Sequence, residues 1–104
     1  MKQAQIQLEA KLFKGFADQS RLLILSVISN GPKTVTEIVD KAKLSQPNTS
    51  AHLACLLECG LIRKEKKGRE VFYEVSAKGV SKIILQAQKI LEQHSKEIYN
   101  CTRY

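Results

Sequence analysis

Apolar and polar residues recur with a helical period over most of the chain. In residues 3–17 the apolar positions fall near one helical face, which predicts a first helix. Asp18 is a favourable N-cap for the stretch RLLILSVISN, which follows within residues 21–30. That stretch is apolar almost all round, so it predicts a buried central helix.

Two short, closely joined helices are predicted next. Thr34 and Glu37 have capping-box spacing, which predicts a helix over 35–43. Ser45 is a good N-cap for a second helix over 46–59. The connection is only one or two residues long, and the second helix begins with small polar side chains. This arrangement is typical of a helix-turn-helix.

The period changes after the second of these helices. Residues 61–65 and 71–75 have the composition of two short strands around a turn at Gly68. Ser76 can cap a long amphipathic helix that completes the chain. The predicted fold is therefore mainly α with a small β-hairpin. The order of four helices, hairpin and helix describes a winged helix-turn-helix, and we expect residues 1–104 to form one domain.

Composition narrows the class of partner. The chain has 104 residues, 43% of them apolar, and a net charge of +7. Such a basic domain indicates a polyanionic partner, either nucleic acid or an anionic membrane. A chain this short leaves much apolar surface uncovered, so we expect an oligomer. No apolar run approaches the roughly 18 residues of a membrane span. The N-terminus also lacks the apolar core of a signal peptide, so we expect a cytoplasmic protein with reduced cysteines.

Two polar segments favour DNA as the polyanionic partner. Side chains able to bond base edges or phosphates gather at the start of the second short helix: Ser45, Gln46, Asn48, Thr49, Ser50 and His52. The predicted hairpin is strongly basic, with Glu65 the one acid among Arg63, Lys64, Lys66, Lys67 and Arg69. Either feature alone also fits an ordinary solvated surface. Together they predict binding to double-stranded operator DNA.

Cys55 and Cys59 lie one turn apart on the same predicted helix. At about 100° per residue, they fall about 130° from the centre of the helix's leucine face. They share a stripe with Asn48 and His52. This position argues against the interpretation that the two cysteines are simply small buried hydrophobic residues.

Two thiols at this spacing can converge on one ion, and Cys101 is the only other cysteine. Three thiolates suit soft ions such as Cd(II), Pb(II), trivalent arsenic or Bi(III). Zn(II) usually prefers four ligands or some nitrogen donors. His52 and His94 could supply nitrogen.

Other interpretations of the cysteines stay open. The pair could oxidise to a disulfide and distort the helix, which would make the protein a redox switch. The cysteines could also be inert in a basic adaptor protein. We find no phosphate loop, no paired carboxylates in a plausible cleft and no nucleophile with an evident base. The sequence therefore predicts neither an enzyme nor an organic cofactor.

Three stretches carry a family resemblance: FADQSRLLILSVI, VTEIVDKAKLSQPNTSAHLACLLECGLI and KKGREVFYEV. Together they resemble the ArsR/SmtB family of metal-responsive winged-helix repressors. The resemblance implies a homodimer whose first and last helices form the interface. It also implies that the effector-free dimer binds operator DNA and that an effector releases it.

The resemblance also guides the choice of metal site. The family's common thiolate motif would lie at TVTEIV, which contains no cysteine, and its site on the last helix would have only His94. The remaining pattern is similar to the CmtR-type cadmium/lead sensors. That subgroup implies Cd(II) or Pb(II) bound by Cys55, Cys59 and Cys101, with Cys101 supplied by the other subunit.

Overall fold

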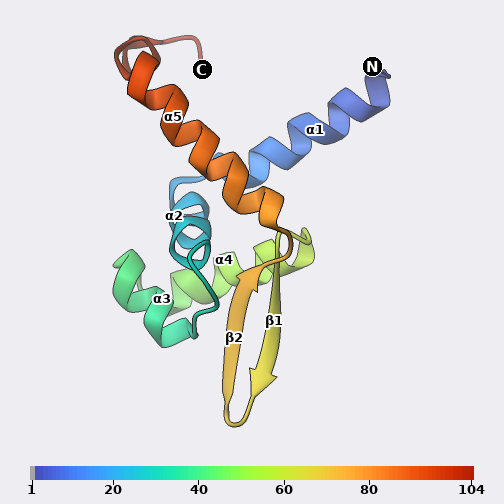
Figure 1. Ribbon diagram of the computed structural model, residues 1–104, viewed down its shortest axis with the longest axis vertical. Coiled ribbons are helices and arrows are strands. Elements are labelled where there is room, and N and C mark those ends of the chain that lie inside the picture. The colour runs from blue at the N-terminus through green and yellow to red at the C-terminus, as the bar shows by residue number, and fades with distance from the viewer. Residues whose placement is uncertain (1) are drawn as a thin grey trace.

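The computed structural model describes residues 2–104 and confirms the predicted order of elements (Figure 1). Four helices come first, then an antiparallel hairpin, then a long helix. Their bounds are α1 Gln3–Phe16, α2 Gln19–Ile28, α3 Val35–Ala42, α4 Gln46–Glu58, β1 Ile62–Lys67, β2 Glu70–Val75 and α5 Lys78–Asn100. The fold is a winged helix-turn-helix, as predicted.

Helices α2, α3 and α4 begin at the N-caps that the sequence predicts. The Asp18 carboxylate accepts a hydrogen bond from the backbone N–H three residues on, at 3.0 Å. Thr34 and Glu37 form the reciprocal capping box, each side chain accepting from the other's backbone N–H. Ser45 accepts in the same way at the start of α4. These local bonds satisfy N–H groups that a helix cannot satisfy within itself.

The prediction for Ser76 is wrong. The N-cap of α5 is Ala77, and α5 has no side-chain cap. The Ser76 hydroxyl instead donates to the carbonyl of Gly60 at 2.6 Å, and its N–H donates to the carbonyl of Leu61 at 3.0 Å. Ser76 therefore ties the end of the hairpin to the end of α4, a long-range contact that competes with local capping.

The hairpin is longer than predicted. Its register pairs Ile62 with Val75 and continues to Lys67 opposite Glu70. Only two residues remain for the turn, and Gly68 adopts a left-handed φ of 65° there. A two-residue turn of this kind lets the ladder run to the tip. In Figure 1 the hairpin projects beyond the helices as the wing.

The core surrounds α2, which contacts α1, α3, α4, α5 and β2. Its centre is apolar side chains from every helix and from the base of the hairpin: Phe16, Ile24, Leu25, Ile28, Ile38, Ala42, Leu53, Leu56, Leu61, Ile62, Val80 and Ile84. The prediction of a central α2 is confirmed, although Leu22 and Leu23 remain exposed on its outer side.

Helices α1 and α5 carry apolar side chains that the protomer does not cover. In Figure 1 both helices extend away from the wing, and both chain ends lie on that side. Exposed large apolar residues on them include Ile6, Leu8, Leu12, Phe13, Leu85, Ile90, Leu91 and Ile98. Over residues 2–104, no helix is long and apolar enough to cross a membrane.

Replacement of Leu56 should test the packing of α4 on the core. Leu56 is fully buried, so Leu56→Ala should lower the free energy of unfolding by about 2–5 kcal/mol, because it leaves a cavity. Leu57→Ala, at the neighbouring half-buried position, is the matched control and should cost clearly less. Urea unfolding followed by circular dichroism measures both. Equal losses would contradict the described orientation of α4.

Candidate DNA-binding surface and thiol cleft

A tight turn joins α3 to α4. Lys43, the C-cap of α3, has a left-handed φ of 59°, which reverses the chain within two residues. Ser45 then caps α4, and Pro47 lies in its first turn, where it costs no hydrogen bond. The two helices therefore have the connection of a helix-turn-helix, in which the start of the second helix is the end expected to read DNA.

Most of the predicted DNA-reading residues of α4 are exposed. Ser45, Gln46, Asn48 and Ser50 all present their side chains to solvent. They occupy the first turn and a half of the helix, where side chains can enter a major groove. The structure brings this part of the predicted surface together.

Thr49 is a correction, because it is fully buried. Its Oγ1 has no hydrogen-bond partner among the described residues. A side chain in the core cannot contact a base or a phosphate, so Thr49 does not belong to the DNA surface. The signal was present in the sequence, since Thr49 lies four residues before the buried Leu53 and so on the same helical stripe.

His52 faces α2 instead of the exposed start of α4. Its side chain is only 21% exposed, and its Nε2 lies 3.9 Å from Oδ2 of Asp18. The backbone N–H of Arg21 holds the pKa of the Asp18 carboxyl below its usual value, and the nearby charges of Arg21 and His52 act in the same direction. A protonated His52 would thus help to tie α4 to the start of α2.

The wing keeps its predicted basic character. Its five cationic side chains are exposed: Arg63, Lys64, Lys66, Lys67 and Arg69. Arg63 pairs with Glu74 on the opposite strand, Nε to Oε1 at 2.6 Å. The Nζ atom of Lys67 lies over the ring of Phe72, 6.0 Å from the ring centroid. Lys64 and Lys66, on the other face of β1 from Arg63 and Lys67, are therefore the better candidates for phosphate contacts.

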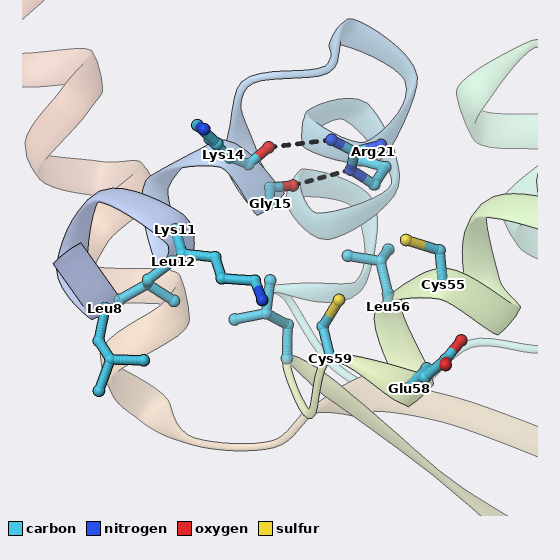
Figure 2. A pocket seen from close by; sticks show the side chains of 11 residues that line it. Leu8, Lys11, Leu12, Lys14, Gly15, Arg21, Cys55, Leu56, Glu58 and Cys59 are labelled. Carbon is cyan, nitrogen blue, oxygen red and sulfur yellow. Dashed lines mark hydrogen bonds between the residues drawn. The ribbon is translucent and has the colours of Figure 1, made fainter.

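Cys55 and Cys59 are exposed, as their position off the leucine face predicted. Both line a cleft of about 660 Å³ between α4 and α1, and Figure 2 shows the two thiols directed toward it. Its walls combine leucines, charged groups and thiols: Leu8, Lys11, Leu12, Lys14, Gly15, Arg21, Cys55, Leu56, Glu58, Cys59 and Leu61. The contribution of α1 is a long-range one that no local pattern in the sequence predicts.

Arg21 closes one end of this cleft and fastens α1 to α2. Its Nε donates to the carbonyl of Gly15 at 3.0 Å, and its Nη2 donates to the carbonyl of Lys14 at 2.9 Å (Figure 2). These carbonyls belong to the last turn of α1, where a cation is favourable. The guanidinium thus positions α1 beside the thiols.

The thiol of Cys59 is harder to ionise than an ordinary thiol. Partial desolvation at the cleft wall raises its pKa, and the neighbouring Cys55 raises it further through charge and hydrogen bonding. Arg21 opposes these effects. Because a metal binds the thiolate, binding at this pair has to displace protons.

Cys101 lies apart from the pair. It follows α5 as its C-cap, half-buried, with its N–H donating to the carbonyl of Ile98 at 3.2 Å, and it does not line the cleft. Within residues 2–104 of one chain, no group of three or more His, Cys, Asp or Glu side chains is placed to hold a metal ion. One protomer therefore assembles two of the three predicted ligands.

The tight helix pair, the basic hairpin after it and the core around α2 define a winged helix-turn-helix of the DNA-binding class. The model of the bacterial regulatory protein arsR family matches residues 18–64. A probable mercury resistance operon repressor of Streptomyces lividans is 33% identical over 94 residues, covering 90% of this chain and 75% of that protein. The chain belongs to the ArsR family.

Two further similarities agree with this assignment. The arsenical resistance operon repressor of Escherichia coli is 40% identical over 70 residues, covering 66% of this chain and 60% of that protein. The structure of HlyU from Vibrio cholerae has a TM-score of 0.76 at 30% identity, covering 89% of this chain and all of that one (100%). The protein is thus a DNA-binding transcriptional regulator and not an enzyme, which confirms the resemblance seen in the sequence at the level of the family.

Alkylation kinetics should show the environment of Cys59. The Cys101→Ser variant keeps Cys55 and Cys59. In this variant the rate at which iodoacetamide modifies Cys59 should rise with pH, and the midpoint of that rise should lie at a higher pH than in an unfolded peptide of the same sequence. Cys55→Ser should lower this midpoint, because it removes a neighbouring thiolate. Mass spectrometry of the modified peptide measures the rate at each pH. A midpoint at or below that of the peptide would contradict the description of the cleft wall.

Proposed function

We propose that this protein is a metal-responsive transcriptional repressor. Its effector-free homodimer binds operator DNA through the exposed start of α4 and the wing. A soft metal ion, Cd(II) or Pb(II), then binds Cys55, Cys59 and Cys101 and releases the DNA. The observation that carries this proposal is the exposed pair of thiols on the same helix whose first turns form the reading end.

The exposed apolar residues of α1 and α5 are an argument for the proposed dimer. Ile6 and Phe13 of α1 and Leu85, Ile90 and Leu91 of α5 are between 45% and 54% exposed, and both helices extend to the same side of the protomer (Figure 1). Several large apolar side chains left exposed on two helices are typical of an interface. A two-fold dimer would carry two wings and two α4 helices. The start of each α4 could then enter one of two successive major grooves on the same face of the DNA.

The third thiolate must come from outside the cleft in this proposal. Cys101 lies beyond the cleft of its own protomer, at the end of α5, which we assign to the dimer interface. A second protomer that packs along α1 and α5 could bring its own Cys101 toward Cys55 and Cys59. Binding would then pin α4 to the partner's tail and change the spacing of the two reading ends. A coupling of about 1–3 kcal/mol would lower DNA affinity roughly 5–150-fold.

Salt dependence should measure how the wing binds phosphates. For a duplex that contains the operator, Lys64→Gln with Lys66→Gln should reduce the slope of log K against log salt by about 0.9 for each phosphate that the wing no longer neutralises. Lys82→Gln on α5, also an exposed lysine, is the control and should leave the slope unchanged. Fluorescence anisotropy at several salt concentrations gives the slopes. Equal slopes for the wild type and the double variant would contradict a phosphate-binding wing.

Mixed dimers should test the origin of the third ligand. A protomer with Cys55→Ser and Cys59→Ser cannot bind the metal, and neither can a homodimer with Cys101→Ser if all three thiolates are needed. A mixture of these two chains forms heterodimers with one complete site only if Cys101 acts across the interface. We expect Cd(II) to release operator DNA from the mixture and not from either variant alone, and the ultraviolet thiolate-to-cadmium absorption to return with it.

Two outcomes would contradict this site. If all single cysteine variants release DNA as the wild type does, the cysteines are not the effector ligands. If a metal-free oxidant such as diamide releases DNA and Cd(II) does not, the protein is a redox switch. The wild type under reducing, metal-free conditions is the common control.

A further inference from the structure

The face of α4 that points away from the core carries only short side chains near its start. Because Thr49 and Leu53 are buried, the opposite side of the helix is its outer face. At about 100° per residue, Ala51 and Ala54 lie about 140–160° from Thr49, and both are exposed. Methyl groups therefore form the part of α4 that a partner would meet first.

Short side chains decide how closely this helix can approach DNA. The major groove of B-DNA is about 12 Å wide and 8.5 Å deep, and a helix with its side chains is about 10–12 Å across. Long side chains on the outer face would keep the backbone of α4 away from the bases. With alanines there, the helix can lie deep in the groove, and a side chain as short as asparagine can reach a base edge.

Asn48 lies beside this methyl surface with its amide available. It is exposed, about 100° from the buried Thr49 around the helix. Its backbone N–H donates to the Ser45 hydroxyl at 3.2 Å, so the helix cap uses the main chain of Asn48 and not its amide. An amide offers one acceptor and an NH₂ donor side by side. Adenine presents the complementary pair in the major groove, its N6–H donor and its N7 acceptor.

The rest of α4 has no group suited to guanine. Guanine presents two acceptors, N7 and O6, which the paired donors of arginine or a lysine ammonium recognise. Helix α4 contains neither Lys nor Arg, and its one carboxylate, Glu58, lies at the far end. The cations of this surface are on the wing. The composition of α4 therefore favours an A·T pair at the position that it reads.

We propose that Asn48 is a specificity-determining residue that reads an adenine of the operator. Its Oδ1 accepts from the adenine N6–H, its Nδ2 donates to N7, and the methyl group of Ala51 contacts the C5-methyl group of a nearby thymine. This inference rests on the proposed function at one point, the entry of the start of α4 into the major groove.

The same contact makes operator binding sensitive to methylation of adenine at N6. In a base-paired adenine, one N6 hydrogen bonds the thymine and the other points into the major groove. A methyl group on N6 takes the major-groove position, because the pairing hydrogen has to stay. It would replace the hydrogen that Oδ1 of Asn48 accepts and would collide with the amide.

Base selection by variants of Asn48 tests the assignment. Reduced, metal-free protein selects duplexes from a library of random sequence, and sequencing gives the base preference at each position. Asn48→Asp keeps the shape of the side chain but can only accept, so the preferred base should change from adenine to cytosine, which presents a donor at N4. Asn48→Ala should lower the preference for adenine about 5–150-fold, the discrimination that a bidentate contact provides.

Asn100→Ala is the matched control for these variants. It makes the same change at an exposed position at the end of α5, so it should leave every base preference unchanged. Circular dichroism checks that each variant is folded. Because the readout is a ratio between bases, a general loss of affinity does not affect it. An adenine preference that persists in both Asn48→Asp and Asn48→Ala would overturn the proposal.

Altered bases in the selected duplex test the contacts atom by atom. N6-methyladenine and 7-deazaadenine each remove one hydrogen bond to Asn48, so each should weaken binding by the wild type roughly 2–10-fold and have little effect on Asn48→Ala. Uracil in place of the contacted thymine removes one methyl group and should weaken binding about fourfold. Fluorescence anisotropy measures the affinities. Equal responses of the wild type and Asn48→Ala to both altered adenines would overturn the reading of adenine.

The same selection separates this inference from the proposed function. A wild type without any base preference would contradict both, because no operator would then exist. A clear preference that variants of Asn48 leave unchanged would overturn the inference alone. Release of the selected duplex by Cd(II) tests the metal site independently of which base Asn48 contacts.

Discussion

Helix α4 packs one stripe of side chains, Thr49, Leu53 and Leu56, into the core around α2, and the rest of the molecule depends on that contact. Because the stripe fixes the rotation of α4 about its axis, it also fixes where the other residues of the helix point. Ser45, Gln46 and Asn48 then face solvent at one end, and the two cysteines face α1 at the other. A single helix thus joins the predicted DNA-reading surface to the thiol cleft.

Arg21 connects α2, at the centre of the core, to α1. By bonding the last carbonyls of α1, it holds α1 across the cleft from the thiols. The opposite face of α1 carries Ile6 and Phe13, which we assign to the dimer surface. An effector bound in the cleft would therefore touch a helix that also shapes the dimer. This gives a short physical route from ligand to the spacing of the two reading ends.

Metal binding at the two thiols would be linked to the release of protons. A metal ion needs thiolates, and the raised pKa of Cys59 makes proton release part of its binding. In the proposed metal site the third thiolate comes from the partner's tail, so metal binding would also depend on how the two protomers pack.

Local chemistry in the sequence determined the order of the elements, the caps at Asp18, Thr34 and Ser45, and the exposure of both α4 cysteines. These features depend on neighbours within one or two helical turns, which can be read directly along the chain. Tertiary structure alone decided that Ser76 binds Gly60, that His52 faces Asp18 and that α1 walls the cleft. These contacts join residues 16 or more positions apart, so they follow from how the helices pack and not from any local pattern.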